Sequence, residues 1–232
     1  MSRGWLIVFA KAPRPGLVKT RMSPPLSLEQ AAELYGEMLA DVLAASGRFA
    51  RDLDLDPVLA FHPPDAAREL VHRTPSGFRL HAQCGSDLGT RMAYAASEAA
   101  AAGVDRILIR GSDSPTLKRG CFEEALARLD AGDDVVLTPD QDGGYAAIGL
   151  RLPESRLFQI EMSTTSVIEE TLARAASLGL RVGQTRPGFD LDTVADLSHL
   201  DAWLRGRSPS EIEELCPRTV GFLASLPPIA VL

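Results

Sequence analysis

Trp5-Leu6-Ile7-Val8-Phe9-Ala10 is a continuous apolar run, and the stretch that follows it, from Lys11 to Leu26, holds four prolines. Runs with β-branched and aromatic members are typical of a strand buried on both faces, as in a parallel sheet. The proline-rich stretch must be a loop, because proline fixes φ and lacks a backbone donor. The sequence therefore predicts a buried first strand that opens into a long, stiff loop.

Beyond this strand, predicted helices and strands alternate. A capping box at Ser27 starts a helix expected to run to about Ser46. Further strands are expected at 58–61, 78–81, 107–109, 135–137, 145–150 and 180–182, and helices at 63–72, 87–102, 121–129 and 163–178. The extended segment 189–193 should close the sheet, with Thr193 capping a helix that begins near Val194. This alternation predicts an α/β fold with a mostly parallel, mixed sheet flanked by helices.

Composition limits the function classes. The chain has 232 residues and a net charge of −7, so we expect no nucleic-acid partner, which would require a basic stripe. Its three cysteines lie far apart without metal-ligand spacing, and no apolar run approaches the roughly 18 residues of a membrane span. We expect one cytoplasmic domain over 1–232, with a core at about 4–205 and a helical tail at 206–232. The apolar end of this tail should pack back or lie at a subunit contact, which leaves a homodimer open.

The loop after the first strand carries Lys11, Arg14, Lys19 and Arg21 and no acidic residue. Lysine binds phosphate as a point charge and arginine as a bidentate fork, so the loop is a candidate diphosphate cradle. The alternative is a solvated proline-rich surface loop. It is not a P-loop, because the Gly-Lys-Ser/Thr ending is missing.

Three carboxylates follow predicted strands. Asp113, in Gly111-Ser112-Asp113-Ser114-Pro115, could hold Mg²⁺ or Mn²⁺ at the ligand-binding edge of the sheet, or could instead cap the next helix. Asp190 and Asp192 are two residues apart in an extended segment and point the same way. They could complete that metal site, or simply be the acids that favour a helix N-terminus.

The turn from Asp140 to Tyr145 contains Gly143 and Gly144. Paired glycines allow the backbone to approach a sugar or base closely, but Asp-Gly is also a strong hairpin signal. Both interpretations stay open. The acidic repeat at 52–56 precedes a strand and is interpreted as a solvated connection, and the scattered histidines and Cys84 lack partners for a metal or nucleophile site.

Five motifs in order carry a family resemblance: FAKAPRPGLVKTRM (residues 9–22), QCGSDLGTRM (83–92), GSDSPTL (111–117), DQDGGYAAIGL (140–150) and DLDTVADL (190–197). Together they resemble the bacterial glycosyltransferase-like family linked to arsenosugar biosynthesis, a branch of the nucleotide-diphospho-sugar transferase (GT-A) superfamily. The resemblance implies a Rossmann-like GT-A fold that binds a nucleotide near the N-terminal loop. One departure is Met162-Ser163-Thr164, where the family often has a tryptophan before Ser/Thr.

The resemblance also implies roles for single residues. Catalytic roles fall on Asp113, Lys19 and Asp142, and metal ligation on Asp113, Asp190 and Asp192, with Mg²⁺ or Mn²⁺ as cofactor. The residues expected to bind the nucleotide sugar are Ala10, Lys11, Ala12, Pro13, Gly16, Lys19, Arg21, Gly89, Arg91, Gly143, Gly144 and Tyr145.

Two reactions suit this scaffold. The expected one is metal-dependent transfer of a sugar from a nucleotide sugar to a small-molecule acceptor. The alternative is a nucleotidyltransferase, similar to guanylyltransferases, that uses a nucleoside triphosphate and releases pyrophosphate, with Lys19 stabilising the developing charge. A third alternative is a non-catalytic nucleotide-binding regulator, against which the presence of Asp113 and Asp192 argues.

Overall fold

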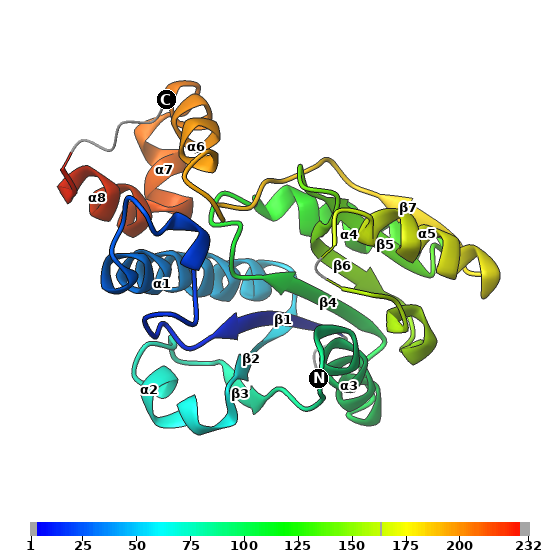
Figure 1. The fold of residues 1–232 in the computed structure, drawn as a ribbon. Coiled ribbons are helices and arrows are strands. Elements are labelled where there is room, and N and C mark those ends of the chain that lie inside the picture. The colour runs from blue at the N-terminus through cyan, green and yellow to red at the C-terminus, as the bar shows by residue number, and fades with distance from the viewer. Residues whose placement is uncertain (1–3, 163, 228–232) are drawn as a thin grey trace.

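A seven-stranded sheet runs through the molecule (Figure 1) in the computed structural model, which describes residues 4–162 and 164–227. The strands are β1 (Gly4–Lys11), β2 (Leu55–His62), β3 (Arg79–Ala82), β4 (Arg106–Gly111), β5 (Val135–Pro139), β6 (Tyr145–Leu150) and β7 (Val182–Gln184). Their order is β3-β2-β1-β4-β6-β5-β7, and all pairs are parallel except those of β6 with β4 and β5. The predicted α/β fold with a mostly parallel, mixed sheet is confirmed.

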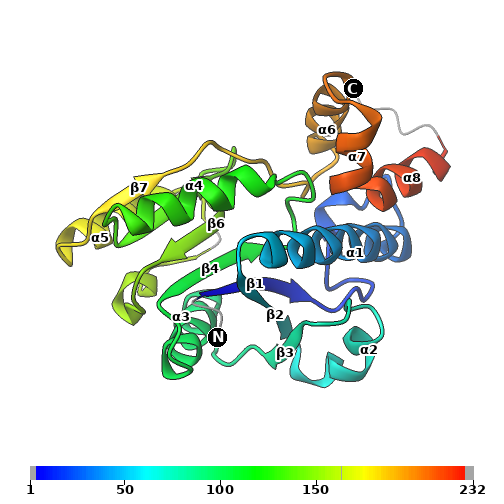
Figure 2. The same ribbon diagram turned by 180° about the vertical axis from the view of Figure 1, so that it is seen from behind.

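Helices cover both faces of this sheet (Figure 2). The longer ones are α1 (Leu28–Asp52), α3 (Leu88–Ala101), α4 (Arg119–Asp130) and α5 (Val167–Ser177), with the short α2 at Ala67–Val71. Side chains of β1 alternate between the two layers: Trp5, Ile7 and Phe9 pack towards α3 and α5, and Leu6 packs towards α1 and α4. Successive residues of a strand point to opposite faces, so a strand with two covered faces is apolar throughout.

Two helices differ in extent from the prediction. α1 runs six residues past Ser46 to Asp52, because Phe49 and Ala50 continue its buried stripe and Phe49 packs on Phe122 of α4. α5 begins at Val167, later than the predicted 163, and Ser163 itself lies outside the described residues.

The segment 189–193 does not join the sheet as a strand. Its Leu191 N–H donates to the Asp113 carbonyl (2.8 Å), which lays the segment beside the loop that follows β4. The expected N-cap at Thr193 is also wrong, because α6 begins at Asp196. Here the side chain of Asp196, inside the helix, accepts hydrogen bonds from the backbone that precedes the helix. Asp196 Oδ2 accepts hydrogen bonds from the backbone of Asp192 (3.0 Å) and of Thr193 (2.7 Å).

The C-terminal helices α6 (Asp196–Arg205), α7 (Pro209–Leu215) and α8 (Pro217–Ser225) gather beside α1 (Figure 1). Asp41 of α1 anchors α8, accepting from Thr219 N (2.8 Å) and Thr219 Oγ1 (2.7 Å). The tail therefore packs back onto the domain as far as it is described. Within residues 4–162 and 164–227, no helix has the length and apolar character needed to cross a membrane.

Candidate functional site

The site lies where β1 and β4 end side by side. These strands are parallel neighbours, and β1 pairs with β2 on its other edge, so the chain reverses its winding direction between β1 and β4. Such a switch point leaves a crevice at the carboxyl ends of the strands. Here the crevice is a cavity with two lobes, which share among their lining residues Phe9, Arg21, Leu88, Gly111, Asp113 and Asp192.

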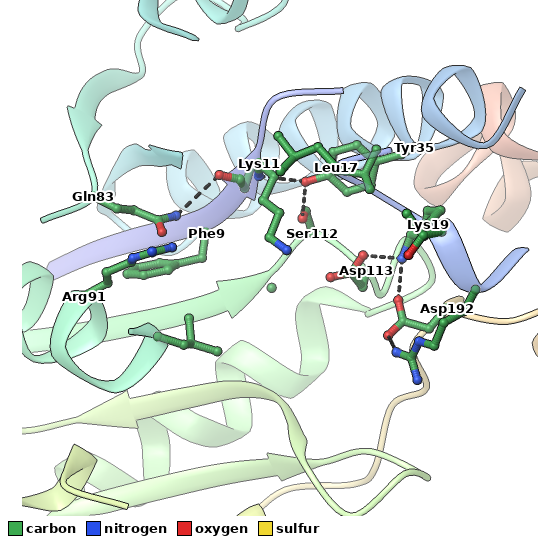
Figure 3. Close-up of a pocket in the computed structure, with 16 residues that line it drawn as sticks. Phe9, Lys11, Leu17, Lys19, Tyr35, Gln83, Arg91, Ser112, Asp113 and Asp192 are labelled. Atoms are coloured by element: carbon green, nitrogen blue, oxygen red, sulfur yellow. Dashed lines mark hydrogen bonds and ion pairs between the residues drawn. The ribbon is translucent and has the colours of Figure 1, made fainter. Parts of the chain in front are cut away.

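The first lobe, which we call the basic lobe, has a volume of ≈ 450 Å³ and contains four cationic side chains. Its walls come from the end of β1, the loop after it, α1, α3 and the loop after β4 (Figure 3). Its lining residues are Phe9, Ala10, Lys11, Leu17, Val18, Lys19, Thr20, Arg21, Tyr35, Gln83, Leu88, Arg91, Gly111, Ser112, Asp113 and Asp192.

The second lobe, which we call the acidic lobe, has a volume of ≈ 370 Å³ and lies towards β6 and the 189–193 segment. Beyond the six shared residues it is lined by three carboxyl groups from the β5–β6 turn and 189–193, by Arg110, by threonines, and by mainly apolar residues. These residues are Met92, Ile109, Arg110, Asp140, Asp142, Gly144, Tyr145, Ala146, Ala147, Met162, Thr164, Thr165, Val167 and Asp190.

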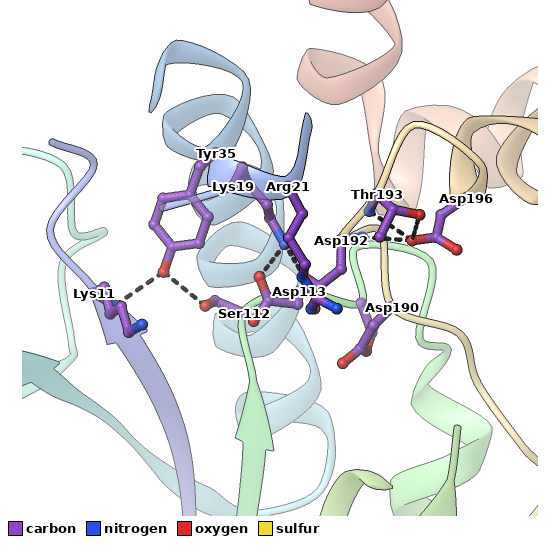
Figure 4. Close-up of polar contacts among 11 residues, drawn as sticks. Lys11, Lys19, Arg21, Tyr35, Ser112, Asp113, Asp190, Asp192, Thr193 and Asp196 are labelled. Atoms are coloured by element: carbon purple, nitrogen blue, oxygen red, sulfur yellow. Dashed lines mark hydrogen bonds and ion pairs between the residues drawn. The ribbon is translucent and has the colours of Figure 1, made fainter. Parts of the chain in front are cut away.

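Lys19 links three distant parts of the chain. Its backbone lies in the left-handed region (φ 48°, ψ 32°), a conformation that costs a non-glycine residue of order 1 kcal/mol. Its side chain is only 2% exposed and bridges the carboxylates of Asp113 and Asp192, the latter at 2.6 Å (Figure 4). Arg21 also pairs with Asp192 (2.5 Å) but is 63% exposed.

This ion cluster fixes the charge state of its members. Burial alone would lower the pKa of Lys19, but the carboxylates of Asp113 and Asp192 outweigh it and raise the pKa above the usual value. Burial likewise works against ionisation of Asp192, but Lys19 and Arg21 lower the pKa of this carboxyl. Lys19 is therefore an ammonium ion and Asp192 a carboxylate at neutral pH.

Hydrogen bonds from β4 and α1 hold the loop that carries Asp113. Arg110 is buried on β4 and donates to the Ser114 carbonyl (2.6 Å) and to Ser46 Oγ of α1 (3.3 Å). Burial lowers the pKa of Arg110 to about 10, so the guanidinium stays charged at neutral pH. A hydrogen bond joins the Tyr35 hydroxyl of α1 to Ser112 Oγ (2.7 Å). The position of Asp113 is thus set by contacts between β4 and α1.

Two carboxyl groups in the acidic lobe titrate near neutrality. Burial, then the neighbouring Asp142 and Asp190, raises the pKa of Asp140 to about 7. Burial, then Asp113, raises the pKa of Asp190 to about 7, although Ser114 donates to it. Asp140 Oδ1 accepts from the Gly144 N–H (2.8 Å), which holds the side chain in the β5–β6 turn. Such like-charge clusters are common at functional sites.

The structure brings most of the predicted residues together. Asp113, Asp190, Asp192, Lys11, Lys19, Arg21, Arg91, Ala10, Asp142, Gly144 and Tyr145 all line the cavity. Asp113 does not cap α4, whose N-cap is Lys118. Among the described residues, no three metal-ligating side chains are arranged to hold a metal ion. Instead, the Lys19 ammonium occupies the space between Asp113 and Asp192.

Five predicted binding residues do not line the cavity: Ala12, Pro13, Gly16, Gly89 and Gly143. Gly143 (φ +90°) is required for internal packing, because a Cβ there would lie 1.9 Å from the Thr165 carbonyl oxygen. A Cβ on Gly89 would lie 2.4 Å from the Phe158 carbonyl oxygen. The predicted hairpin at 140–144 is confirmed by the antiparallel pairing of β5 with β6.

Other cavity residues were not predicted from the sequence. Tyr35 fits the apolar stripe of α1, and its hydroxyl contacts the site only because α1 packs over β1 and β4. Gln83 lines the basic lobe and donates to the Ala60 (2.8 Å) and Ala10 (3.3 Å) carbonyls. Asp140 lies in the motif at 140–150, and its position shortly before Gly143 and Gly144 is the sequence signal that could have identified it as a site residue. Met162 and Thr164 line the acidic lobe, and they belong to the segment in which this sequence lacks the family's tryptophan.

Comparison with known proteins supports a family and a fold. The sequence pattern of DUF2064, described as an uncharacterized protein conserved in bacteria, matches residues 43–164, just over half of the chain. No curated protein matches the sequence. Among solved structures, a candidate nucleotide-diphospho-sugar transferase from Desulfovibrio desulfuricans G20 is 29% identical with a TM-score of 0.82, and the match covers 97% of this chain and 95% of that one.

More distant structures share the architecture. A cytidylyltransferase from Leptospira borgpetersenii is 11% identical with a TM-score of 0.56, over 97% of this chain and 93% of that one. A 4-diphosphocytidyl-2C-methyl-D-erythritol synthase from Anaerococcus prevotii is 10% identical with a TM-score of 0.55, over 87% of this chain and 96% of that one. At these identities the likeness concerns the fold alone. The chain therefore has the fold found in nucleotide-sugar and nucleotidyl transferases.

Proposed function

The chain belongs to the DUF2064 family of bacterial proteins, and we propose that it is a nucleotide-diphospho-sugar transferase that passes a sugar to a small-molecule acceptor. The similar Desulfovibrio structure, named for the same class, supports this at 29% identity. Within that class, the five ordered motifs favour the branch linked to arsenosugar biosynthesis, and the assignment to this branch is part of the proposal.

The observation that carries the proposal is the charge division of the cavity. The basic lobe contains Lys11, Lys19, Arg21 and Arg91, which suits a diphosphate. The acidic lobe adjoins it through Asp113 and Asp192 and suits an acceptor with hydroxyl groups. A donor and an acceptor bound in adjoining lobes would meet at the shared wall, and holding two reactants in this way removes much of the entropic cost of their encounter.

In the proposed reaction, an acceptor hydroxyl oxygen forms a bond to the anomeric carbon of the sugar. The bond from that carbon to the diphosphate oxygen breaks, and its electron pair leaves with the nucleoside diphosphate. The hydroxyl proton passes to a carboxylate of the acidic lobe, for which Asp142 is the candidate. Lys19, Lys11 and Arg91 stabilise the charge that develops on the leaving diphosphate.

The proposal includes a divalent cation bound at the shared wall of the two lobes. Asp113 and Asp192 already share one cation, the Lys19 ammonium, so their oxygens lie close enough to share Mg²⁺ or Mn²⁺ when Lys19 turns to the phosphates. Carboxylate oxygens are the ligands that these ions prefer, so the donor set fits. A bound ion would neutralise negative charge on the diphosphate. Asp190 lies beside the pair, but Ser114 donates to it.

The nucleotidyltransferase alternative keeps one argument in its favour, because four cationic groups could also neutralise a triphosphate. It needs an acceptor that carries a phosphate to attack the α-phosphorus. That phosphate would have to lie in the acidic lobe, among Asp140, Asp142 and Asp190. Like-charge repulsion disfavours this arrangement, so sugar transfer is the better-supported reaction.

The direct test is a binding and turnover screen. UDP-, GDP-, dTDP- and CDP-sugars and the matching triphosphates are measured by calorimetry with and without Mn²⁺, followed by analysis of products. We expect one nucleotide sugar to bind and to release a nucleoside diphosphate in the presence of an acceptor. Asp113→Asn should abolish the Mn²⁺-dependent part of this binding. Pyrophosphate release from a triphosphate would instead establish nucleotidyl transfer, and binding of a nucleotide without any turnover would favour a regulator.

A further inference from the structure

The acidic lobe contains three neighbouring carboxyl groups. Among the described residues, Asp140, Asp142 and Asp190 form no ion pair with a lysine or arginine, although all three line the same cavity. The Asp140 and Asp190 side chains are partly buried, so water screens their mutual repulsion less than at an open surface. A cluster like this is more stable when a cation lies among its members.

The nearest cations are already engaged elsewhere. Lys19 bridges Asp113 and Asp192, and Arg21 pairs with Asp192. Arg110 lines the lobe and its positive charge acts on Asp190, but its guanidinium donates to the Ser114 carbonyl, the Gly111 carbonyl and Ser46 rather than to a carboxylate. Asp140, Asp142 and Asp190 therefore line the space in which the acceptor would lie without an ion pair of their own among the described residues.

The rest of the lobe suits an organic molecule. Met92, Ile109 and Met162, which pack in one hydrophobic cluster, give the lobe an apolar side. The volume of ≈ 370 Å³ falls in the range of small-molecule sites. The described side chains do not assemble a metal-ion site at this position. A small molecule with an apolar part and a cationic group matches both features, whereas a bare metal ion would leave the apolar side unused.

We propose that the acidic lobe takes its acceptor as an organic cation: a small amine with hydroxyl groups and no phosphate. The ammonium group lies against Asp140 and Asp190, while a neighbouring hydroxyl faces Asp142 and the shared wall. This inference rests on the proposed function, because it names the class of acceptor for the same site. It makes the charge of the acceptor the main determinant of specificity.

Three probes of similar size isolate the charge: glucosamine, glucose and glucosamine 6-phosphate. Their affinities are measured by calorimetry on the full chain, first with metal removed by chelation and the nucleotide sugar identified above present at saturation. Glucosamine should bind at least about tenfold more tightly than glucose, since one charge-assisted hydrogen bond in a shielded site is worth about that factor. Glucosamine 6-phosphate should bind weaker than glucosamine.

Matched variants test whether the carboxyl groups cause this preference. Asp140→Asn and Asp190→Asn should each reduce the preference for glucosamine over glucose below about threefold, with little change for glucose. The control is Asp105→Asn, since Asp105 is exposed before the start of β4, at the opposite end of that strand. It should keep the full preference. Circular dichroism verifies that each variant is folded.

The outcomes separate the two proposals. Equal binding of glucosamine and glucose, or tighter binding of the phosphate, overturns the cationic acceptor while leaving nucleotide-sugar binding intact. Displacement of glucosamine by Mn²⁺ that depends on Asp140 also overturns it, because the lobe would then be an inorganic cation site. If no nucleotide sugar binds in the first step, the proposed function fails, whatever the amine does.

Discussion

Lys19 Nζ lies 2.6 Å from Asp192 Oδ1, although 173 residues separate them in the chain. The contact joins the loop after β1 to the segment that precedes α6, and Asp113 after β4 completes it. An ammonium ion held in this way is positioned before any ligand arrives. The Lys19 side chain can then turn from the two carboxylates to a phosphate with little rearrangement of the backbone.

Replacement of this ammonium is the first prediction. Lys19→Met keeps the length of the side chain but leaves Asp113 and Asp192 without their shared cation. We expect a loss of about 1–3 kcal/mol in the free energy of unfolding, less than for a fully buried pair because Asp113 is 36% exposed. Affinity for a nucleoside diphosphate should fall at least about tenfold.

Denaturant unfolding at pH 7 and calorimetry measure these effects. The double variant Lys19→Met, Asp192→Asn should recover part of the stability, since one unpaired charge is removed. Arg21→Ala is the control, because Arg21 is 63% exposed and should change stability by less than about 1 kcal/mol. Unchanged diphosphate affinity in Lys19→Met would contradict the role given to the loop.

Arg110 supplies a second prediction, on the support of the Asp113 loop. Arg110→Met removes the hydrogen bonds to the Ser114 carbonyl (2.6 Å) and to Ser46 Oγ (3.3 Å) and leaves these buried groups unsatisfied. The expected cost is about 2–4 kcal/mol in the free energy of unfolding. Ser46→Ala, which removes only the longer bond, should cost about 1 kcal/mol. Equal effects of the two variants would show that the guanidinium does not fix this loop.

The sequence was sufficient to predict that most residues of the candidate site lie together. The apolar run of β1 and the glycine-bounded end of β4 mark buried strands, and loops that follow neighbouring parallel strands meet at one edge. Lys19 and Asp113 could therefore be placed together from local patterns. Asp192 follows from the same logic, although a backbone hydrogen bond from Leu191 to Asp113, and not strand pairing, lays the segment that carries it beside the loop after β4.

Contacts between layers could not be predicted in this way. Tyr35 has the spacing of a core residue, and only the packing of α1 across β1 and β4 brings its hydroxyl to Ser112. Arg110 follows the apolar run Ile107–Ile109 of β4, and its partners lie on α1 and in the following loop. The extent of α1 likewise depends on Phe49 meeting Phe122, a contact with no local signature.

Gly143 gives a third prediction, which tests its packing role. Gly143→Ala would place a Cβ 1.9 Å from the Thr165 carbonyl oxygen, so the β5–β6 turn must shift in addition to the strain of φ +90°. We expect a loss of more than about 2 kcal/mol in the free energy of unfolding. Gly179→Ala is the matched control, with φ +70° and nothing within 4 Å. Thermal unfolding should show the control losing only about 1 kcal/mol.

The last prediction concerns the pH dependence of stability. The pKa of Asp140 is about 7 in the folded protein, because burial and the neighbouring Asp142 and Asp190 oppose its ionisation. In the unfolded chain an aspartate titrates near pH ~4. Between these values the folded state holds the proton more tightly, so ionisation of Asp140 costs stability progressively as the pH rises from about 4 to about 7.

Asp140→Asn removes this cost while an amide oxygen can still accept the Gly144 N–H. The variant should match the wild type near pH 4.5 and exceed it at pH 8 by about 1 kcal/mol, or about 2–4 °C in Tm, a figure kept small because the side chain is partly exposed. Metal is removed by chelation in both scans, since a cation bound near Asp190 or Asp192 would relieve the same repulsion. Asp105→Asn should show no such divergence with pH. If the two curves for Asp140→Asn and wild type stay parallel from pH 4.5 to 8, the carboxyl groups of the acidic lobe do not repel one another in the folded protein, and the electrostatic argument for a cationic acceptor loses its basis.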